Sequence, residues 1–402
     1  MNKPTAPRRV VKITAIFIVV IVSFALLEGV ARIAYQFRDD LKTVAMSLAR
    51  DNIIASLRLD PYEMPAEDIP GHWRLRPGFS ATNEEIAAAK QNAGKFLGAR
   101  VLRGAEKGKT TEKNRLQINS RGFKGPEIDL ESHRIRVLML GDSVTFGYGS
   151  LSYPRMAEKV LRDNGLAVDV INGGVEGYSP KNALYEMDRY LALKPDVVTV
   201  YLGWNALFSM DQVENIYERW LRSVWLIRRL WYFLTVLVED PETRAKMLYG
   251  RALTPDLPAA RRVVEDGYVP SFMDDIKTLI DRFSEKGIKV VIITLPGLFS
   301  TSETPSPEAL KKGHLPEFTT NPYVLARLSE QYNLALRKMA ETHKLQVIDL
   351  EKWSRSALQP RAKYFTDSVH LTAQGLSRVA GEIAADIKPD VEKILAARKP
   401  PQ

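Results

Sequence analysis

Cysteine is absent from this chain of 402 residues, and histidine occurs only five times. A chain without thiols forms no disulfide, has no thiolate nucleophile and holds no iron–sulfur cluster. Four of the histidines show no metal-ligand spacing, and the sequence His-Glu-x-x-His does not occur. We therefore expect no bound metal, and we expect these four to be surface or packing residues: His72, His133, His314 and His343.

Nucleotide and nucleic-acid binding also lack their usual sequence features. Gly147-Tyr148-Gly149 is not followed by the remainder of a phosphate-binding glycine motif, so we expect no nucleotide cofactor. The net charge of +9 (57 basic minus 48 acidic residues) is moderate, and part of it lies near the N-terminus rather than in a nucleic-acid-binding motif. With 45% hydrophobic and 26% charged residues, the chain has the composition of a globular protein.

An uncharged apolar run at residues 13–27 follows basic residues at the N-terminus. As a helix it would be about 22 Å long, shorter than a hydrocarbon core of roughly 30 Å. Extension to residue 35 gives about 34 Å. The extension includes Glu28 and Arg32, which lie four apart on one helical face and can pair near the membrane interface. We predict a single transmembrane signal anchor at residues 13–35.

The basic residues before this run predict a cytoplasmic tail at residues 1–12. The chain would then be a single-pass inner-membrane protein whose larger part is periplasmic or otherwise extracytoplasmic. A cleaved signal peptide is the alternative, but no small-x-small cleavage site follows the run. The pair Glu28 and Arg32 has a second interpretation, a contact with the helix of a membrane partner.

Strand and helix patterns alternate through a predicted domain at residues 131–390. Strands are predicted at 136–140, 168–172, 197–202, 289–294 and 346–350, and helices at 153–164, 180–193, 271–286, 323–343 and 373–387. The alternation is typical of an α/β fold with a three-layer, doubly wound parallel sheet. Residues 36–130 would form a stalk and a small N-terminal extension, with a strand, turn and strand at 116–126, and residues 391–402 a tail.

The sequence Gly141-Asp142-Ser143 directly follows the first strand of this domain. Its serine therefore lies on a strand-to-helix turn at the carboxyl edge of the sheet, where open α/β sheets bind their ligands. A serine hydroxyl needs a neighbouring base to take its proton, and His370 is the candidate. Asp367, three residues earlier, can hold the imidazole in the required tautomer. By itself Gly-Asp-Ser is a common turn sequence, and Asp-x-x-His can begin a helix.

Four short blocks occur in a fixed order: Gly-Asp-Ser-x-Thr-x-Gly at 141–147, Asn-Gly-Gly at 172–174, Gly-Trp-Asn at 203–205 and Asp-x-x-His at 367–370. In this order they resemble the SGNH (GDSL-type) hydrolases, over residues from about 136 to 387. The resemblance implies Ser143 as nucleophile, His370 as base and Asp367 as the acid that orients it. It also implies an oxyanion hole formed by the backbone N–H groups of Ser143 and Gly174 and the side-chain amide of Asn205.

One residue departs from this pattern. The third block usually reads Gly-x-Asn-Asp, whereas Ala206 follows Asn205 here. That aspartate is not part of the family's triad, so the change affects local support more than chemistry.

Two insertions interrupt the alternating pattern, at residues 206–270 and 296–321. The first carries one apolar helical stripe flanked by arginines, made by Trp220, Val224, Ile227, Trp231, Leu234 and Val238. The stripe predicts either a lid that packs on the sheet domain or an interfacial helix on an anionic membrane. The second is rich in proline, serine and threonine, and we expect it to line the substrate cleft as a mobile loop.

These features predict a serine esterase that acts through an acyl-serine intermediate and needs no cofactor. The resemblance implies a substrate carrying O-acyl, in particular acetyl, groups on cell-surface or extracellular glycans. The alternatives are an O-acetyltransferase on polysaccharide, a lipid esterase, and a non-catalytic subunit of a polysaccharide assembly system. The expected partners are the acylated glycan, the membrane and polysaccharide-assembly proteins, but no nucleic acid.

Overall fold

The computed structural model describes residues 6–36, 61–63, 72–82, 85, 115–209, 221–224, 226–227, 230 and 251–398. The chain divides into two compact units, one comprising Met1–Asp51, Glu67–Gly71 and Glu214–Asp240 and the other the remainder. The predicted stalk helix at 36–57 lies outside the described residues apart from Gln36, and four residues of the apolar stripe do so as well: Trp220, Trp231, Leu234 and Val238.

The first unit contains one long helix, α1 (Ala6–Gln36). Its segment Ile16–Gln36 has a mean hydropathy of 2.4 and is long and apolar enough to cross a membrane, a property that a signal sequence shares. Apolar side chains from Ile16 to Ile33 are largely exposed. The predicted pair is formed, with Arg32 Nε 2.9 Å from Glu28 Oε1.

The second unit is built on a five-stranded parallel sheet with the order β6-β5-β7-β8-β9. Its strands are β5 (Ile135–Gly141), β6 (Val168–Gly174), β7 (Val197–Tyr201), β8 (Lys289–Ile293) and β9 (Gln346–Ile348). Every residue of β5 and β7 is buried, as expected where helices cover both faces of a sheet. All five predicted strands are confirmed, and β5 and β6 run on to the glycines of their motifs.

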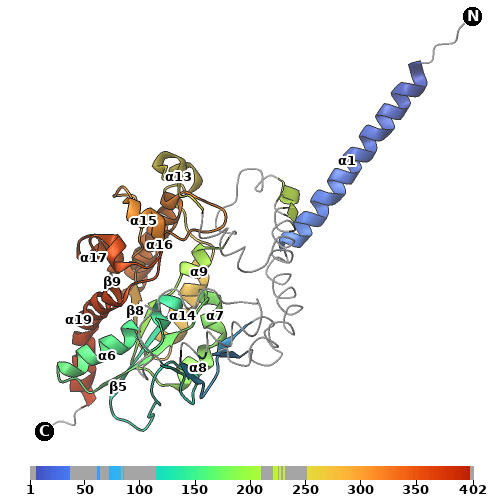
Figure 1. The fold of residues 1–402 in the computed structure, drawn as a ribbon. Helices are drawn as coiled ribbons and strands as arrows, with labels where there is room; N and C mark the ends of the chain where they lie inside the picture. The colour runs from blue at the N-terminus through green and yellow to red at the C-terminus, as the bar shows by residue number, and fades with distance from the viewer. Residues whose placement is uncertain are drawn as a thin grey trace, which may run out of the picture. The chain divides into compact units, whose positions relative to one another are not determined.

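Helices cover both faces of this sheet (Figure 1). One layer contains α6 (Tyr153–Asp163) and α19 (Ala373–Arg398), which pack on each other and on β5 and β6. The other contains α7 (Pro180–Tyr185), α14 (Met273–Ser284) and α16 (Pro322–His343), which contact each other or the remaining strands. Because parallel crossovers are right-handed, reversing the strand order after β6 moves the helices to the opposite face. The three-layer, doubly wound α/β fold is confirmed.

Several helices of this unit begin with a side-chain cap directly before proline. Ser179, Ser306 and Asn321 accept backbone N–H groups of α7, α15 (Pro307–Lys312) and α16. Proline suits the first helical turn because its missing N–H would have no partner there, and the capping oxygen satisfies another of the free donors. These dipeptides set where the helices begin, and therefore where the preceding loops end.

The structure differs from the sequence prediction in four places. The helix expected at 180–193 is two helices, α7 and α8 (Met187–Ala192), which meet at Glu186. The expected loop at 296–321 contains α15 and the buried Leu298, Phe299 and Leu315, so it is part of the core. Helix α19 runs to Arg398 with Val391 buried, beyond the predicted boundary at 390. Helices α17 (Leu350–Ala357) and α18 (Arg361–Tyr364) were too short to be indicated by periodicity.

The described part of the N-terminal extension belongs to the same unit as the sheet. It forms two small antiparallel sheets, from β1 (Tyr62–Glu63) with β2 (Arg74–Leu75) and from β3 (Ser80–Thr82) with β4 (Arg115–Gln117). The predicted strand at 116–126 is confirmed only as β4, followed by a turn and by isolated bridges from Lys124 to Ile118 and to Asn172. Its apolar side chains join the main core, so this unit begins before residue 131: Leu75, Leu116, Ile118 and Phe123.

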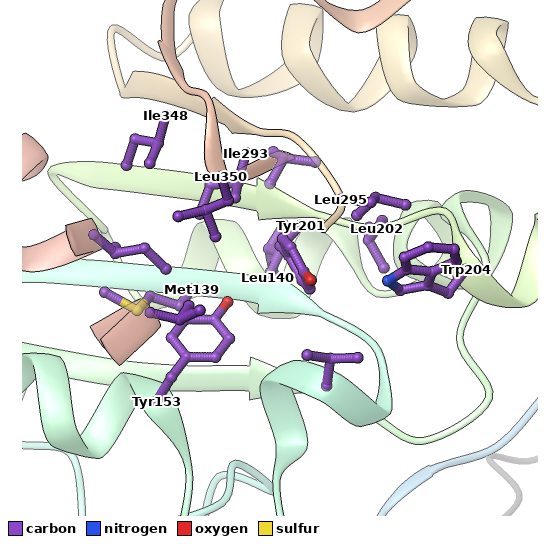
Figure 2. Close-up of a cluster of buried hydrophobic side chains, with 14 of the residues drawn as sticks. Met139, Leu140, Tyr153, Tyr201, Leu202, Trp204, Ile293, Leu295, Ile348 and Leu350 are labelled. Carbon is purple, nitrogen blue, oxygen red and sulfur yellow. The ribbon is translucent and has the colours of Figure 1, made fainter. Parts of the chain in front are cut away.

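The centre of the core lies between the sheet and its helices, and Figure 2 shows Met139, Leu140 and Tyr201 of the central strands packed with Tyr153 of α6. The turn that leaves this core is closed by Gly147, at the end of α5 (Ser143–Phe146), with φ 75° and ψ −158°. Only glycine adopts this backbone conformation readily. A Cβ added there would also overlap the carbonyl oxygen of Leu151.

Replacing Gly147 with alanine should therefore lower the free energy of unfolding by more than a positive φ alone costs. Gly165→Ala is the matched control, because Gly165 has φ +80° but open space around an added Cβ. We expect about 1–2 kcal/mol for the control and a larger loss for Gly147→Ala, measured by urea unfolding. Equal losses would show that the contact with Leu151 does not constrain this turn.

Candidate active site

The candidate site lies at the carboxyl edge of the sheet. Ser143 follows β5, Gly174 ends β6 and Asn205 lies in α9 (Trp204–Leu207) directly after β7. Since β5 lies between β6 and β7, these three strand ends are neighbours at the point where the strand order reverses. Open α/β sheets bind their ligands at this point.

Ser143 is the first residue of α5, and Asp142 caps that helix. Asp142 Oδ1 accepts the N–H of Val144 at 3.0 Å. The first N–H groups of a helix have no partner within it, so the backbone N–H of Ser143 is suited to bind a developing negative charge. By fixing the first turn of α5, the Asp142 cap sets the position of Ser143, both its hydroxyl group and its backbone N–H.

The three predicted triad residues form one hydrogen-bonded relay. Ser143 Oγ lies 2.8 Å from His370 Nε2, and His370 Nδ1 lies 2.8 Å from Asp367 Oδ2. The other oxygen of Asp367 accepts the backbone N–H groups of Val369 and His370, each at 2.9 Å. Asp367 thus holds both the ring of His370 and the loop that carries it, which is the arrangement required for His370 to accept the serine proton.

The two partners shift each other's pKa in opposite directions. Burial by itself would lower the pKa of His370, but the negative charge and hydrogen bond of Asp367 outweigh it, and the pKa is raised above 6.5. Burial would raise the pKa of Asp367, but the positive charge of His370 and its hydrogen bonds lower it well below the usual value. Asp367 therefore stays ionised while His370 titrates.

A second carboxyl group, next to Ser143 in the chain, acts electrostatically on the relay. Asp142 is fully buried, and burial raises its pKa to about 6, although the backbone N–H of Val144 and the charge of His370 act against this. Its Oδ2 has no hydrogen-bond partner among the described residues. The charges of Asp142 and His370 act on each other, so the acidic limb of a pH profile reports both groups.

Two of the predicted oxyanion donors make contacts within the chain. The Gly174 N–H donates to Asn172 Oδ1 at 2.9 Å. Asn205 Nδ2 donates to the carbonyl oxygen of Tyr178 at 3.1 Å, which leaves its second N–H for a ligand. The structure brings the three donor-bearing residues to one edge, but the Gly174 donor is directed at its own chain.

Asn172 links the serine turn to the oxyanion strand, a role that the sequence did not indicate. Its Nδ2 donates to the carbonyl oxygens of Thr145 at 3.0 Å and Phe146 at 3.4 Å, while its Oδ1 accepts the Gly174 N–H. One amide therefore sets the spacing between α5 and Gly174. An added Cβ on Gly174 would collide with the backbone of α5, which shows how closely the two approach.

Lys124 supports the same turn and was not singled out from the sequence. Its Nζ donates to the carbonyl oxygen of Phe146 at 2.6 Å and lies 4.4 Å from the centre of the Phe146 ring. Burial lowers the pKa of Lys124 to about 7, opposed by the charge of Glu176. When it is protonated, this amine places its positive charge at the carboxyl end of α5, where positive charge is favourable. A lysine that follows a turn has no distinctive sequence pattern, because its acceptor is a backbone carbonyl.

Two further side chains lie beside the imidazole. The Tyr148 ring is centred 6.3 Å from the ring of His370, and its hydroxyl is 3.3 Å from Thr366 Oγ1. The negative charge of Glu176 helps to raise the pKa of His370. The hydroxyl of Tyr62 donates to Glu176, so the N-terminal extension contacts the loop that follows Gly174.

Two of the four histidines expected to be surface or packing residues make specific contacts: His72 pairs with Glu186, and His314 stacks on Phe208.

The raised pKa of His370 predicts the pH dependence of ester hydrolysis. The base must be neutral, so kcat/KM should rise with pH through a midpoint above 6.5. Asp367→Asn removes the carboxylate that raises the pKa, so the midpoint should fall and kcat should drop by about 10²-fold or more. Steady-state kinetics between pH 5 and 9 on a soluble ester would measure both, and an unchanged midpoint would contradict the assigned coupling.

Lys124→Met should lower kcat by about 10- to 100-fold with a smaller effect on KM, because a misplaced serine turn slows chemistry more than binding. Lys124→Arg keeps the charge and should restore part of the rate. Lys159→Met is the control, since Lys159 is an exposed lysine of α6 that pairs with Asp163. Kinetics at constant pH with circular dichroism to check folding would decide, and equal rates for the two methionine variants would refute the role.

The described residues contain no group of three or more histidine, cysteine, aspartate or glutamate side chains suited to hold a metal ion. The site as built consists of a hydroxyl, an imidazole, carboxylates and amide donors. This set can activate a hydroxyl nucleophile and stabilise an oxyanion.

Comparison with known proteins bears on the same residues. The model of the GDSL-like lipase/acylhydrolase family matches residues 139–377, which include every residue of the relay and the three donors. No curated protein sequence matches the chain.

Solved structures with low similarity include a lipase/acylhydrolase from Enterococcus faecalis, 19% identical over 64% of this chain and 96% of that chain (TM-score 0.38). A variant of the acetyl xylan esterase Axe2 from Geobacillus stearothermophilus is 14% identical over 63% and 94% (TM-score 0.38). A G-D-S-L family lipolytic protein from Veillonella parvula is 16% identical over 62% and 97% (TM-score 0.36). The family model covers more than half of the chain, and on that basis the chain belongs to the GDSL-like lipase/acylhydrolase family.

Proposed function

We propose that the chain is a serine ester hydrolase that acts through an acyl-serine intermediate. The observation that carries this proposal is the relay from Ser143 Oγ through the imidazole of His370 to Asp367, with both hydrogen bonds at 2.8 Å. A partly exposed serine and histidine at the carboxyl edge of a parallel sheet are accessible to a substrate.

In the first half-reaction, Ser143 Oγ bonds to the carbonyl carbon of the ester while its proton moves to His370 Nε2. The carbonyl oxygen becomes an oxyanion, stabilised by the backbone N–H of Ser143 and the free N–H of Asn205 Nδ2, with the Gly174 N–H joining if Asn172 turns away. His370 then gives its proton to the leaving alkoxide. Water repeats these steps on the acyl-serine and releases the carboxylic acid.

We propose that the substrate is an O-acyl, in particular O-acetyl, group on a glycan. Support comes from the side chains next to the base, because the ring of Tyr148 and the carboxylate of Glu176 offer a flat face and a hydrogen-bond acceptor to a hydroxyl-rich molecule. A sugar hydroxyl in place of water would make the same chemistry an acetyl transfer. An alkyl-ester lipid would use neither group.

Helix α1 fits the proposed location. Its apolar, exposed segment Ile16–Gln36 is suited to a membrane anchor, and basic residues before it favour a cytoplasmic N-terminus. The enzyme would then act outside the cytoplasm, on glycans at or beyond the membrane surface.

Fluorophosphonate labelling tests the nucleophile, because the reagent reacts with an activated serine. The full chain in detergent should label, and Ser143→Ala and His370→Ala should each lose the label. Ser152→Ala is the control, since Ser152 is the buried cap of α6. Among acyl esters, acetyl should be cleaved faster than longer chains.

One observation favours a non-catalytic relative, the engagement of the Gly174 N–H by Asn172. In that case the folded wild-type chain would fail to label. Loss of labelling only in the Ser152 variant would likewise refute Ser143 as nucleophile.

A further inference from the structure

Glu28 is an acidic residue in the apolar part of α1, and the candidate active site gives no reason for it. It lies within the apolar segment Ile16–Gln36, where an unpaired carboxylate is costly in hydrocarbon. Arg32 pairs with it at 2.9 Å, yet the side chain of Arg32 is 60% exposed while that of Glu28 is only 13% exposed. Something other than Arg32 therefore covers the carboxylate.

The cover comes from the first insertion of the same chain. Glu28 Oε1 accepts the backbone N–H of Arg222 and Oε2 accepts that of Ser223, each at 2.9 Å. Residues 222–224 are helical, so the carboxylate caps the first free N–H groups of a helical segment and its charge meets the positive end of that segment. Both halves of this contact belong to one compact unit.

Two more contacts fix the segment along α1. The guanidinium of Arg222 lies 3.7 Å from the centre of the Tyr35 ring, seven residues beyond Glu28. Ala31 and Ser223 are both buried, at 0% and 2% exposure, whereas most apolar side chains of α1 are exposed. One face of α1 between Glu28 and Tyr35 is thus covered by the chain itself, which replaces the membrane partner considered for the pair Glu28 and Arg32.

The position of Glu28 sets the depth of this contact. Glu28 and Arg32 are the first charged residues after the uncharged run at residues 13–27, and long charged side chains in a span reach toward the headgroups. The helical segment therefore begins on the exit side of the bilayer, where these charges lie. The face that carries Ser223 continues at helical spacing to Ile227 and Leu230, which are 56% and 53% exposed. Where α1 does not cover it, this face is exposed to the medium around α1, which is the bilayer if α1 spans a membrane.

We propose that the interfacial segment, defined by residues 222–224, 226–227 and 230, lies on the bilayer surface with Ile227 and Leu230 among the lipid chains near the headgroups. Glu28 and Tyr35 of α1 hold its beginning in place. The inference rests on the proposed function of α1 as a membrane anchor. It favours the interfacial helix over the lid as the role of this part of the first insertion, because apolar side chains with high exposure beside a membrane helix are those of a lipid-binding surface.

The absence of cysteine makes a direct test simple, since each introduced cysteine is the only labelling site. Ile227→Cys and Leu230→Cys variants of the full chain are labelled with an environment-sensitive fluorophore and reconstituted into vesicles of phosphatidylethanolamine and phosphatidylglycerol. Lipids carrying a nitroxide near the headgroup or deep in the acyl chain report depth by quenching. Val20→Cys in α1 and Leu334→Cys in α16 are matched controls, because both replace exposed apolar residues.

The proposal expects shallow nitroxides to quench the probes at 227 and 230 at least threefold more strongly than the probe at 334, with a blue-shifted emission. The probe at 20 should be quenched by the deep nitroxide. Emission and quenching at 227 and 230 equal to those at 334, with 20 still quenched, would overturn the proposal and leave the anchor intact. An unquenched probe at 20 would instead refute the anchor and the inference with it.

Glu28→Ala and Glu28→Gln test the cap. Alanine removes both acceptors, so quenching at 230 should fall to the level at 334, whereas glutamine keeps one acceptor oxygen and should retain part of the quenching. Hydrolysis of a soluble ester should be unchanged in both. Full quenching at 230 in Glu28→Ala would show that the carboxylate does not hold the segment.

Discussion

The candidate site depends on the imidazole of His370, whose two ring nitrogens are hydrogen-bonded to Ser143 and to Asp367. His370 and Ser143 are 227 positions apart in the sequence, and their contact exists only because the loop after α18 returns to the end of β5. Asp367 makes that return specific, since one oxygen binds the ring and the other binds two backbone N–H groups of the same loop. A single carboxylate thus fixes the tautomer, the ring position and the loop conformation together.

The opposite side of the site is set by hydrogen bonds to backbone carbonyls. Asn172 and Lys124 both donate to the carbonyl oxygen of Phe146, and Asn172 also accepts the Gly174 N–H. Each bond satisfies a buried polar group that would otherwise be costly. The serine turn and the oxyanion strand are therefore coupled, so that a shift in one displaces the other. In the proposed mechanism, the amide that sets their spacing would compete with the substrate oxyanion for the Gly174 N–H.

The strands and the overall fold could be predicted because buried parallel strands such as β7 are largely apolar runs, and because β5 and β6 end in the glycines of their motifs. The residues of the relay could be proposed because they lie at strand ends or in a recognisable block. The contacts of Lys124, Asn172 and Tyr148 could not, since their partners are backbone carbonyls or residues far along the chain. The cap that Glu28 forms could not be predicted for the same reason, because the donors to its carboxylate are main-chain N–H groups 194 and 195 positions away.

The central claim is that Ser143 becomes acylated during turnover, and intact-protein mass spectrometry tests it most directly. The full chain would be mixed with an excess of an activated acetyl ester, quenched in acid within the first turnovers, and mapped by peptide analysis. The account predicts a mass increase of one acetyl group on the peptide containing Ser143, absent in Ser143→Ala and accumulating in a variant with slowed deacylation. Turnover of the ester with no acetyl on Ser143, or acetylation at another residue, would contradict it.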